Sequence, residues 1–200
     1  MDLSRRLARF IQRIDNLVAT IAAHDHGDAL DREATYLVER VLIQLQLEWE
    51  HFVRNVILDS ATGKFEYSSR PVVSSLPVRL GSREQVSHYL LTLYRNRKFE
   101  PDWYLPSDAI DAASKLGLSN YANLSAQLGI SPWKIDDLRH VRNFIAHRSK
   151  RSALKLRDSG LVTSRDLNPV DCAFDYGATG TKHYLEWSNF IKYVATAMVK

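Results

Sequence analysis

The sequence contains very little cysteine and no long apolar run, and each absence excludes a class of protein. Cys172 is the only cysteine in 200 residues, which excludes an intramolecular disulfide and any multi-cysteine metal site. No stretch of 18 consecutive apolar residues occurs, and the N-terminal segment lacks the pattern of a signal peptide. We therefore expect a soluble cytoplasmic protein. No pattern in the sequence indicates a metal site or a cofactor, and we expect neither.

The remaining composition is that of an ordinary globular protein. Hydrophobic residues make up 45% of the chain, and 200 residues are enough to bury a core without disulfides. The formal net charge of +4 is modest, so the distribution of the basic residues is more informative than their number. Length and composition favour a single domain that spans residues 1–200.

Apolar residues recur at helical spacing along most of the chain. Glycine and proline interrupt this pattern at 60–80 and 149–180, which we expect to be irregular apart from a short extended piece at 72–73. The pattern predicts an all-α protein whose long helices pack as a bundle. The predicted helices span residues 3–23, 31–59, 82–97, 107–116, 119–128, 131–147 and 182–198.

The segment from Arg142 to His147 carries the most definite chemistry. At about 100° per residue, Asn143 and His147 share one face of the predicted helix with His140. An imidazole can move protons, and an amide and a guanidinium can bind a phosphate. The opposite face is an apolar stripe that we expect to pack in the core, formed by Ile135, Leu138, Val141 and Ile145.

Arg142 falls at the edge of that apolar stripe, so its head group needs a partner or must reach solvent. Glu50, on the largely apolar second helix, is a candidate partner because a buried acid also needs pairing. Glu50 and the adjacent His51 either support the site or simply line their helix.

A basic stretch surrounds this segment. From residue 139 to residue 157 there are seven Lys and Arg side chains and no acid. Such a run most often forms a solvated face, but beside an imidazole it also offers sequence-independent contacts to a phosphate backbone. The seven residues are Arg139, Arg142, Arg148, Lys150, Arg151, Lys155 and Arg157.

The pattern Arg142-Asn143-x-x-x-His147 resembles the Arg-polar-x-x-x-His signature of the HEPN superfamily, all-helical domains of prokaryotic toxins and defence systems. The preceding long helix, with the segment LEWEHFVRNVIL, is similar to RiboL-PSP and MAE-type members. The resemblance covers the first two helices, the motif helix and the last helix. It implies a HEPN-like helical bundle in which residues 60–130 are an inserted elaboration.

The resemblance also implies a metal-independent endoribonuclease of toxin or phage-defence type, in which the RNA 2′-hydroxyl attacks the adjacent phosphate. His147 would act as general base or acid, Arg142 would hold the phosphate, and Asn143 would orient His147 or the substrate. Glu50 and His140 would support the site. The basic residues expected to bind RNA are Arg139, Arg148, Lys150 and Arg151.

Partners follow from the same resemblance. HEPN proteins usually form homodimers, which would bring two motifs together in one composite cleft, and an antitoxin or defence-system protein is a further expected partner. Some toxin members carry a tyrosine two residues after the histidine, where an antitoxin attaches AMP. This chain has Ser149 at that position, which puts control by that modification in doubt.

Other groupings of polar residues favour simpler interpretations. His24-Asp25-His26 is interpreted as a polar helix end, and Arg54-Asn55-x-x-x-Asp59, which lacks an imidazole, as helix surface. Two alternatives to the nuclease remain open. One is a non-catalytic HEPN-like module that binds RNA or a protein, and the other is an interaction domain that does not bind nucleic acid.

Overall fold

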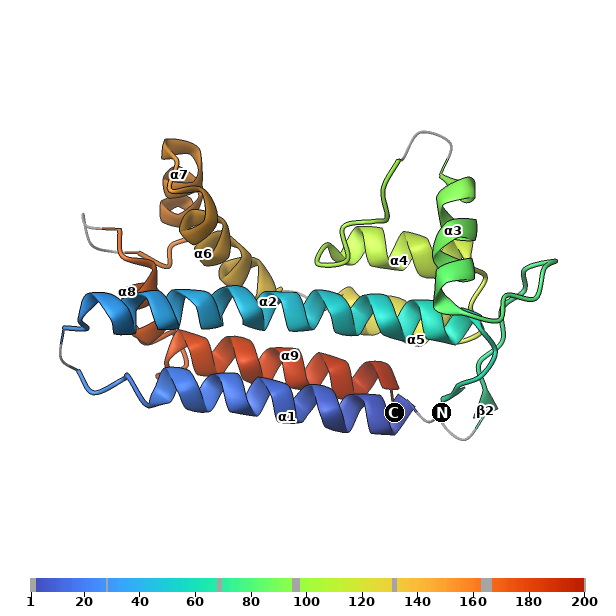
Figure 1. Ribbon diagram of the computed structural model, residues 1–200, viewed down its shortest axis with the longest axis horizontal. Helices are drawn as coiled ribbons and strands as arrows, with labels where there is room; N and C mark the ends of the chain where they lie inside the picture. The colour runs from blue at the N-terminus through green and yellow to red at the C-terminus, as the bar shows by residue number, and fades with distance from the viewer. Residues whose placement is uncertain are drawn as a thin grey trace. The chain divides into compact units, whose positions relative to one another are not determined.

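The computed structural model describes residues 3–27, 29–67, 70–94, 98–130, 133–162 and 167–199, and these form a mostly helical protein (Figure 1). The all-α prediction is confirmed. Strands β1 (Glu66–Tyr67) and β2 (Arg70–Pro71) pair as a two-stranded antiparallel hairpin. The helices are α1 (Leu3–Ala22), α2 (Arg32–Ala61), α3 (Arg83–Leu93), α4 (Pro106–Lys115), α5 (Tyr121–Leu128), α6 (Ile135–His147), α7 (Lys150–Asp158), α8 (Pro169–Phe174) and α9 (His183–Val199).

The chain divides into two compact units. The first unit comprises Met1–Phe10, Trp49–Ser131 and Tyr193–Lys200, and the second comprises Ile11–Glu48 and Pro132–Lys192. Helices α1, α2 and α9 each contribute one segment to each unit. The single domain expected from the sequence stays a prediction.

The second unit contains the predicted motif helix. Its segments of α1, α2 and α9 run side by side, and α6 packs against α7 and α8 (Figure 1). The apolar positions of these helices are buried because each helix turns one stripe toward its neighbours. The fully buried side chains include Ile14, Ile21, Leu42, Leu45 and Trp187.

The first unit holds the hairpin and α3, α4 and α5, so it includes all of the predicted elaboration at 60–130. Helix α4 packs against both α3 and α5. Asp59 at the end of α2 is only 3% exposed and pairs with Arg6 and Arg83. The interpretation of Arg54-Asn55-x-x-x-Asp59 as helix surface is therefore wrong for Asp59, because arginines from α1 and α3 cover it.

Two further expectations need correction. Residues 149–180 are only partly irregular, because two short helices lie in this stretch. Ser149 caps α7, and Asn168 caps α8, with Pro169 in the first turn of α8. Helix α6 begins at Ile135 rather than near residue 131. The first two residues of the predicted range, Ser131 and Pro132, lie outside the described residues.

Along the described stretches, none of the helices combines the length and the apolar character that crossing a membrane requires.

Candidate functional site

A small pocket lies in the second unit, where α6 ends and α7 begins. Its volume is about 190 Å³. Two imidazoles, one amide, two hydroxyls and two cations line it, and none of its lining residues is acidic or a large apolar residue. The lining residues are His140, Asn143, His147, Ser149, Arg151, Ser152 and Lys155.

The predicted polar face of α6 is confirmed, since His140, Asn143 and His147 all line this one pocket. The buried face differs in one position from the expected stripe. Phe144 is buried whereas Ile145 is half-buried, and the guanidinium of Arg148 lies 5.6 Å from the centre of the Phe144 ring. The other three stripe residues, Ile135, Leu138 and Val141, are buried as expected.

Arg142 forms a hydrogen bond with the adjacent Asn143. Its Nη1 donates a hydrogen bond to Oδ1 of Asn143 at 2.9 Å, which fixes the amide and leaves its Nδ2 donor for the pocket. Arg142 does not line the pocket, and its buried Nε has no hydrogen-bond acceptor among the described residues. The predicted pairing with Glu50 stays a prediction, because Glu50 belongs to the first unit and Arg142 to the second.

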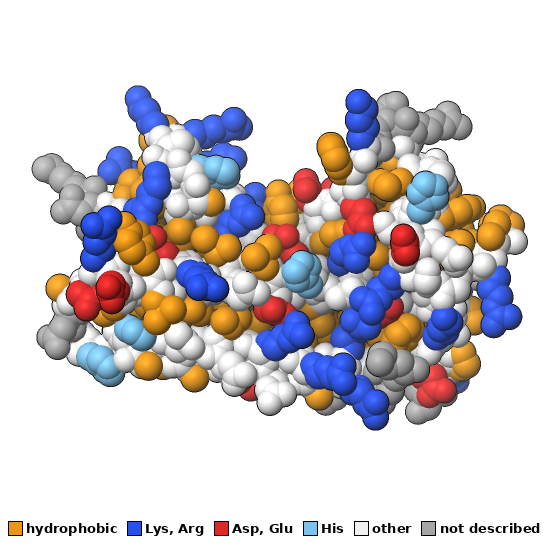
Figure 2. All heavy atoms as spheres, viewed as in Figure 1, with side chains coloured by type: hydrophobic (Ala, Val, Ile, Leu, Met, Phe, Trp, Pro, Cys, Tyr) orange, Lys and Arg blue, Asp and Glu red, His pale blue; other side chains and the backbone are white. Residues whose placement is uncertain are grey.

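The basic residues divide into two groups. Arg139 pairs with Asp136 at 3.0 Å, and Arg148 pairs with the buried Glu39 of α2. Lys150 and Arg151 are exposed, and in the part of the chain that the structure describes no salt bridge joins either of them to an acid. Figure 2 shows Lys and Arg side chains projecting around α7, so this side of the second unit presents uncompensated positive charge.

Ser149 and Ser152 also line the pocket, although the sequence did not indicate them as site residues. Lys155, which the sequence placed only in the basic stretch, lines it as well. Ser149 and Ser152 form a capping box, in which Ser149 Oγ accepts from Ser152 N at 3.2 Å and Ser149 N donates to Ser152 Oγ at 3.1 Å. The spacing Ser-x-x-Ser was a usable signal for the start of α7. Because Lys155 follows Ser152 by three residues, it shares the same face of that helix.

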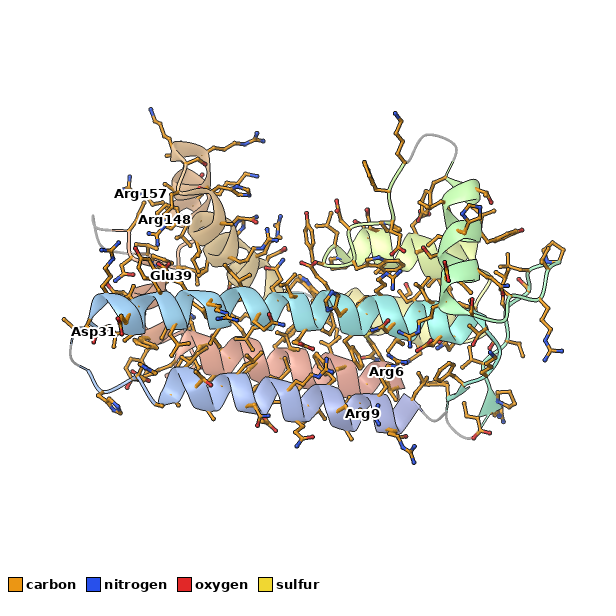
Figure 3. The ribbon with its side chains drawn as sticks, in the orientation of Figure 1. Arg6, Arg9, Asp31, Glu39, Arg148 and Arg157 are labelled. Atoms are coloured by element: carbon orange, nitrogen blue, oxygen red, sulfur yellow. The ribbon has the colours of Figure 1, made fainter. Side chains whose placement is uncertain are left out.

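The corner between α6 and α7 depends on Arg148. This residue ends α6 in the left-handed conformation, with φ of 43°, which a side-chain-bearing residue adopts at a cost of about 1–2 kcal/mol. Its side chain points toward Glu39 (Figure 3), 109 residues away in sequence, and no local signal reveals that partner. We infer that the ion pair holds the corner that places His147 beside Ser149.

A matched pair of substitutions separates the two roles of Arg148. Both Arg148→Ala and Arg148→Gly remove the ion pair, but only glycine adopts the left-handed conformation without strain. We expect urea unfolding to show Arg148→Gly more stable than Arg148→Ala by about 1 kcal/mol. Equal stability of the two variants would mean that the backbone at residue 148 is not held in this conformation.

The environment of His140 favours its neutral form. Burial lowers the pKa of His140, Arg139 and Lys155 lower it further, and only Asp136 opposes them. A neutral imidazole can accept a proton, so His140 suits a general base at neutral pH.

The lowered pKa of His140 also predicts a pH dependence of stability. Between its folded pKa and the ordinary value of about 6.5, the unfolded chain binds more protons than the folded protein. Stability should therefore rise with pH in that range and fall on acidification. We expect His140→Gln to lose less of its free energy of unfolding than the wild-type protein between about pH 7.5 and pH 5.5, measured by urea titration. A constant difference between the two proteins at both pH values would contradict this.

No group of three or more His, Cys, Asp or Glu side chains that could hold a metal occurs among the residues with described positions. Comparison with known proteins gave no matching family model, no matching curated protein and no matching solved structure.

Proposed function

We propose that this protein is a metal-independent endoribonuclease of the HEPN type, acting as a toxin or a phage-defence effector in the cytoplasm. The observation that supports this best is the set of side chains in one pocket. Imidazoles, an amide and uncompensated cations come together there, without an acid to repel a phosphate. The Arg142-Asn143-x-x-x-His147 resemblance supports the same chemistry.

A phosphate in this pocket would meet Arg151, Lys155 and the N-terminus of α7, whose first backbone N–H groups and helix dipole favour an anion. Asn143 Nδ2 would donate to a phosphate oxygen. His140, whose environment favours the neutral imidazole, would take the proton of the 2′-hydroxyl as its oxygen attacks phosphorus. The P–O5′ bond breaks, and the departing O5′ receives a proton from the other imidazole or from its counterpart in a second copy.

We further propose that the active form is a homodimer with two copies of the motif in one composite cleft. His147 and the residues that follow it up to Arg151 are exposed, so they are accessible to a second copy. An antitoxin or another defence protein is the proposed regulatory partner.

One observation favours the non-catalytic alternative, a HEPN-like module that binds RNA or a protein. Arg142, the residue expected to hold the phosphate, bonds to Asn143 and does not line the pocket. In this alternative Arg142 stabilises the end of α6, and the pocket binds RNA or a protein without catalysing a reaction.

An RNA digest with analysis of the product ends tests the proposal. The purified protein should cleave single-stranded RNA in the presence of EDTA and leave 2′,3′-cyclic phosphate and 5′-hydroxyl ends. An RNA of the same sequence with 2′-O-methyl groups should remain intact, because it lacks the attacking hydroxyl. Salt-sensitive RNA binding without cleavage, with and without divalent cations, would overturn the nuclease and support the alternative.

A further inference from the structure

A second group of basic residues lies in the first unit, around the buried carboxylate of Asp59. Arg6 of α1 pairs with Asp59 Oδ2, and Nε of Arg83 lies 2.8 Å from Asp59 Oδ1. Burial lowers the pKa of Arg6 and Asp59 raises it, while Arg83 and the nearby Arg9 lower it further. We call Arg6, Arg9 and Arg83 the α1–α3 arginine cluster.

The cluster carries more positive charge than its acid can neutralise. The cluster has three guanidinium groups but only one carboxylate, Asp59, which pairs with Arg6 and Arg83. In the described ranges no ion pair joins Arg9 to an acid. The nearby Arg54 is neutralised separately, because its Nη2 donates to Glu100 Oε1 at 2.6 Å. Burial would raise the pKa of Glu100, but hydrogen bonds from Arg54 and other donors outweigh burial and lower it to about 2. The remaining excess charge would be relieved by a bound anion.

The side chains of the cluster are also held in position before any ligand binds. The Arg83 side chain is held by Asp59 and by Asn55 Oδ1, which accepts from Arg83 Nη1 at 2.6 Å, yet 44% of that side chain stays exposed. A guanidinium has five donors in a planar fork, so Arg83 keeps donors for an external oxygen. Figure 3 shows Arg6 and Arg9 on neighbouring turns of α1, with Arg6 toward α2. Figure 2 shows Lys and Arg side chains gathered over this part of α1 and the neighbouring part of α2.

We propose that the α1–α3 arginine cluster binds the phosphate backbone of a polynucleotide, as a contact surface separate from the pocket at α6 and α7. Guanidinium forks match the geometry of phosphate oxygens, and contacts to the backbone require charge rather than apolar anchors. Protein interfaces are instead centred on buried aromatic and apolar side chains. Among the described residues, no exposed large apolar side chain lies on α1, on residues 49–61 of α2 or on α3, which favours nucleic acid over an acidic protein.

Binding to a labelled 2′-O-methyl RNA of about 12 nucleotides tests this surface. This probe cannot be cleaved by 2′-hydroxyl attack, so the result does not depend on the proposed nuclease activity. Fluorescence anisotropy between about 50 and 200 mM KCl gives the slope of the logarithm of the binding constant against the logarithm of the salt concentration. For Arg9→Gln and for Arg83→Gln we expect affinity to fall about 3- to 10-fold at low salt and the slope to fall by about 0.7.

Arg79→Gln is the matched control, since it removes one exposed positive charge from the same unit but outside the cluster. The proposal fails if the two cluster variants bind the probe as Arg79→Gln does. It also fails if a polyglutamate peptide of equal charge binds as tightly as the probe and depends on the same arginines, because the surface would then fit an acidic protein. Arg9→Gln should leave the fold intact, because Arg9 is exposed and makes no ion pair within the described stretches. A loss of binding in this variant is therefore not caused by unfolding.

Discussion

His147→Ala is expected to cleave RNA about 10²- to 10⁴-fold more slowly than the wild-type protein, because it removes an imidazole that transfers a proton in the reaction. His147 is exposed at the end of α6, so the fold should survive the substitution, with a change in stability of about 0.5 kcal/mol or less. The measurement is the initial rate of RNA cleavage with EDTA present, together with the thermal midpoint of each protein.

His26→Ala is the matched control for this substitution. His26 is also exposed and belongs to the second unit, but it does not line the pocket. We expect it to cleave RNA at the wild-type rate. If His147→Ala and His26→Ala were equally active, His147 would have no part in the chemistry. If wild type, His147→Ala and His26→Ala all bound RNA without cutting it, the pocket would be a binding site only.

Asp59→Ala is expected to destabilise the protein by about 3–5 kcal/mol, because it leaves the partly buried Arg6 without its counter-charge. Burial raises the pKa of Asp59, whereas Arg6 and Arg83 lower it, so the carboxylate is stabilised only by the arginines that cover it. For a protein of 200 residues, such a loss corresponds to a decrease in Tm of about 10 °C. Differential scanning calorimetry and urea unfolding measure it.

Asp15→Ala supplies the comparison. Asp15 forms an ion pair with Lys192 at 2.8 Å, but its side chain is 53% exposed, so the pair is screened by solvent. Its loss should change the free energy of unfolding by less than about 1 kcal/mol. Similar decreases in the free energy of unfolding for Asp59→Ala and Asp15→Ala would show that the burial of Asp59 does not strengthen its ion pairs.

Helical periodicity explains which parts of the site were predictable. Residues 140, 143 and 147 fall on one face of any α-helix with 3.6 residues per turn, so the sequence predicted that these three side chains meet. The same argument placed three of the four residues of the apolar stripe in the core. Helix α7 was missed because it is short and has only two buried side chains, Ser152 and Leu156, which is too few to show a period.

Contacts between distant segments could not be predicted in this way. The partner of Arg148 is Glu39, and the partners of Asp59 come from α1 and α3. Arg142 was expected to bind phosphate, yet its Nη1 donates a hydrogen bond to the adjacent Asn143. A charged side chain has several rotatable bonds and reaches many candidates, so its partner depends on which helices lie beside it.

The sequence by itself determined the helical class, the faces of the motif helix and the residue types available for phosphate chemistry, because these depend on spacing along one chain segment. Only the tertiary structure decided that α7 turns back at Arg148 to complete the pocket, and that Asp59 is buried beneath arginines. Both outcomes depend on charges from separate helices that must be paired once they leave water, and such pairing is set by packing rather than by local sequence.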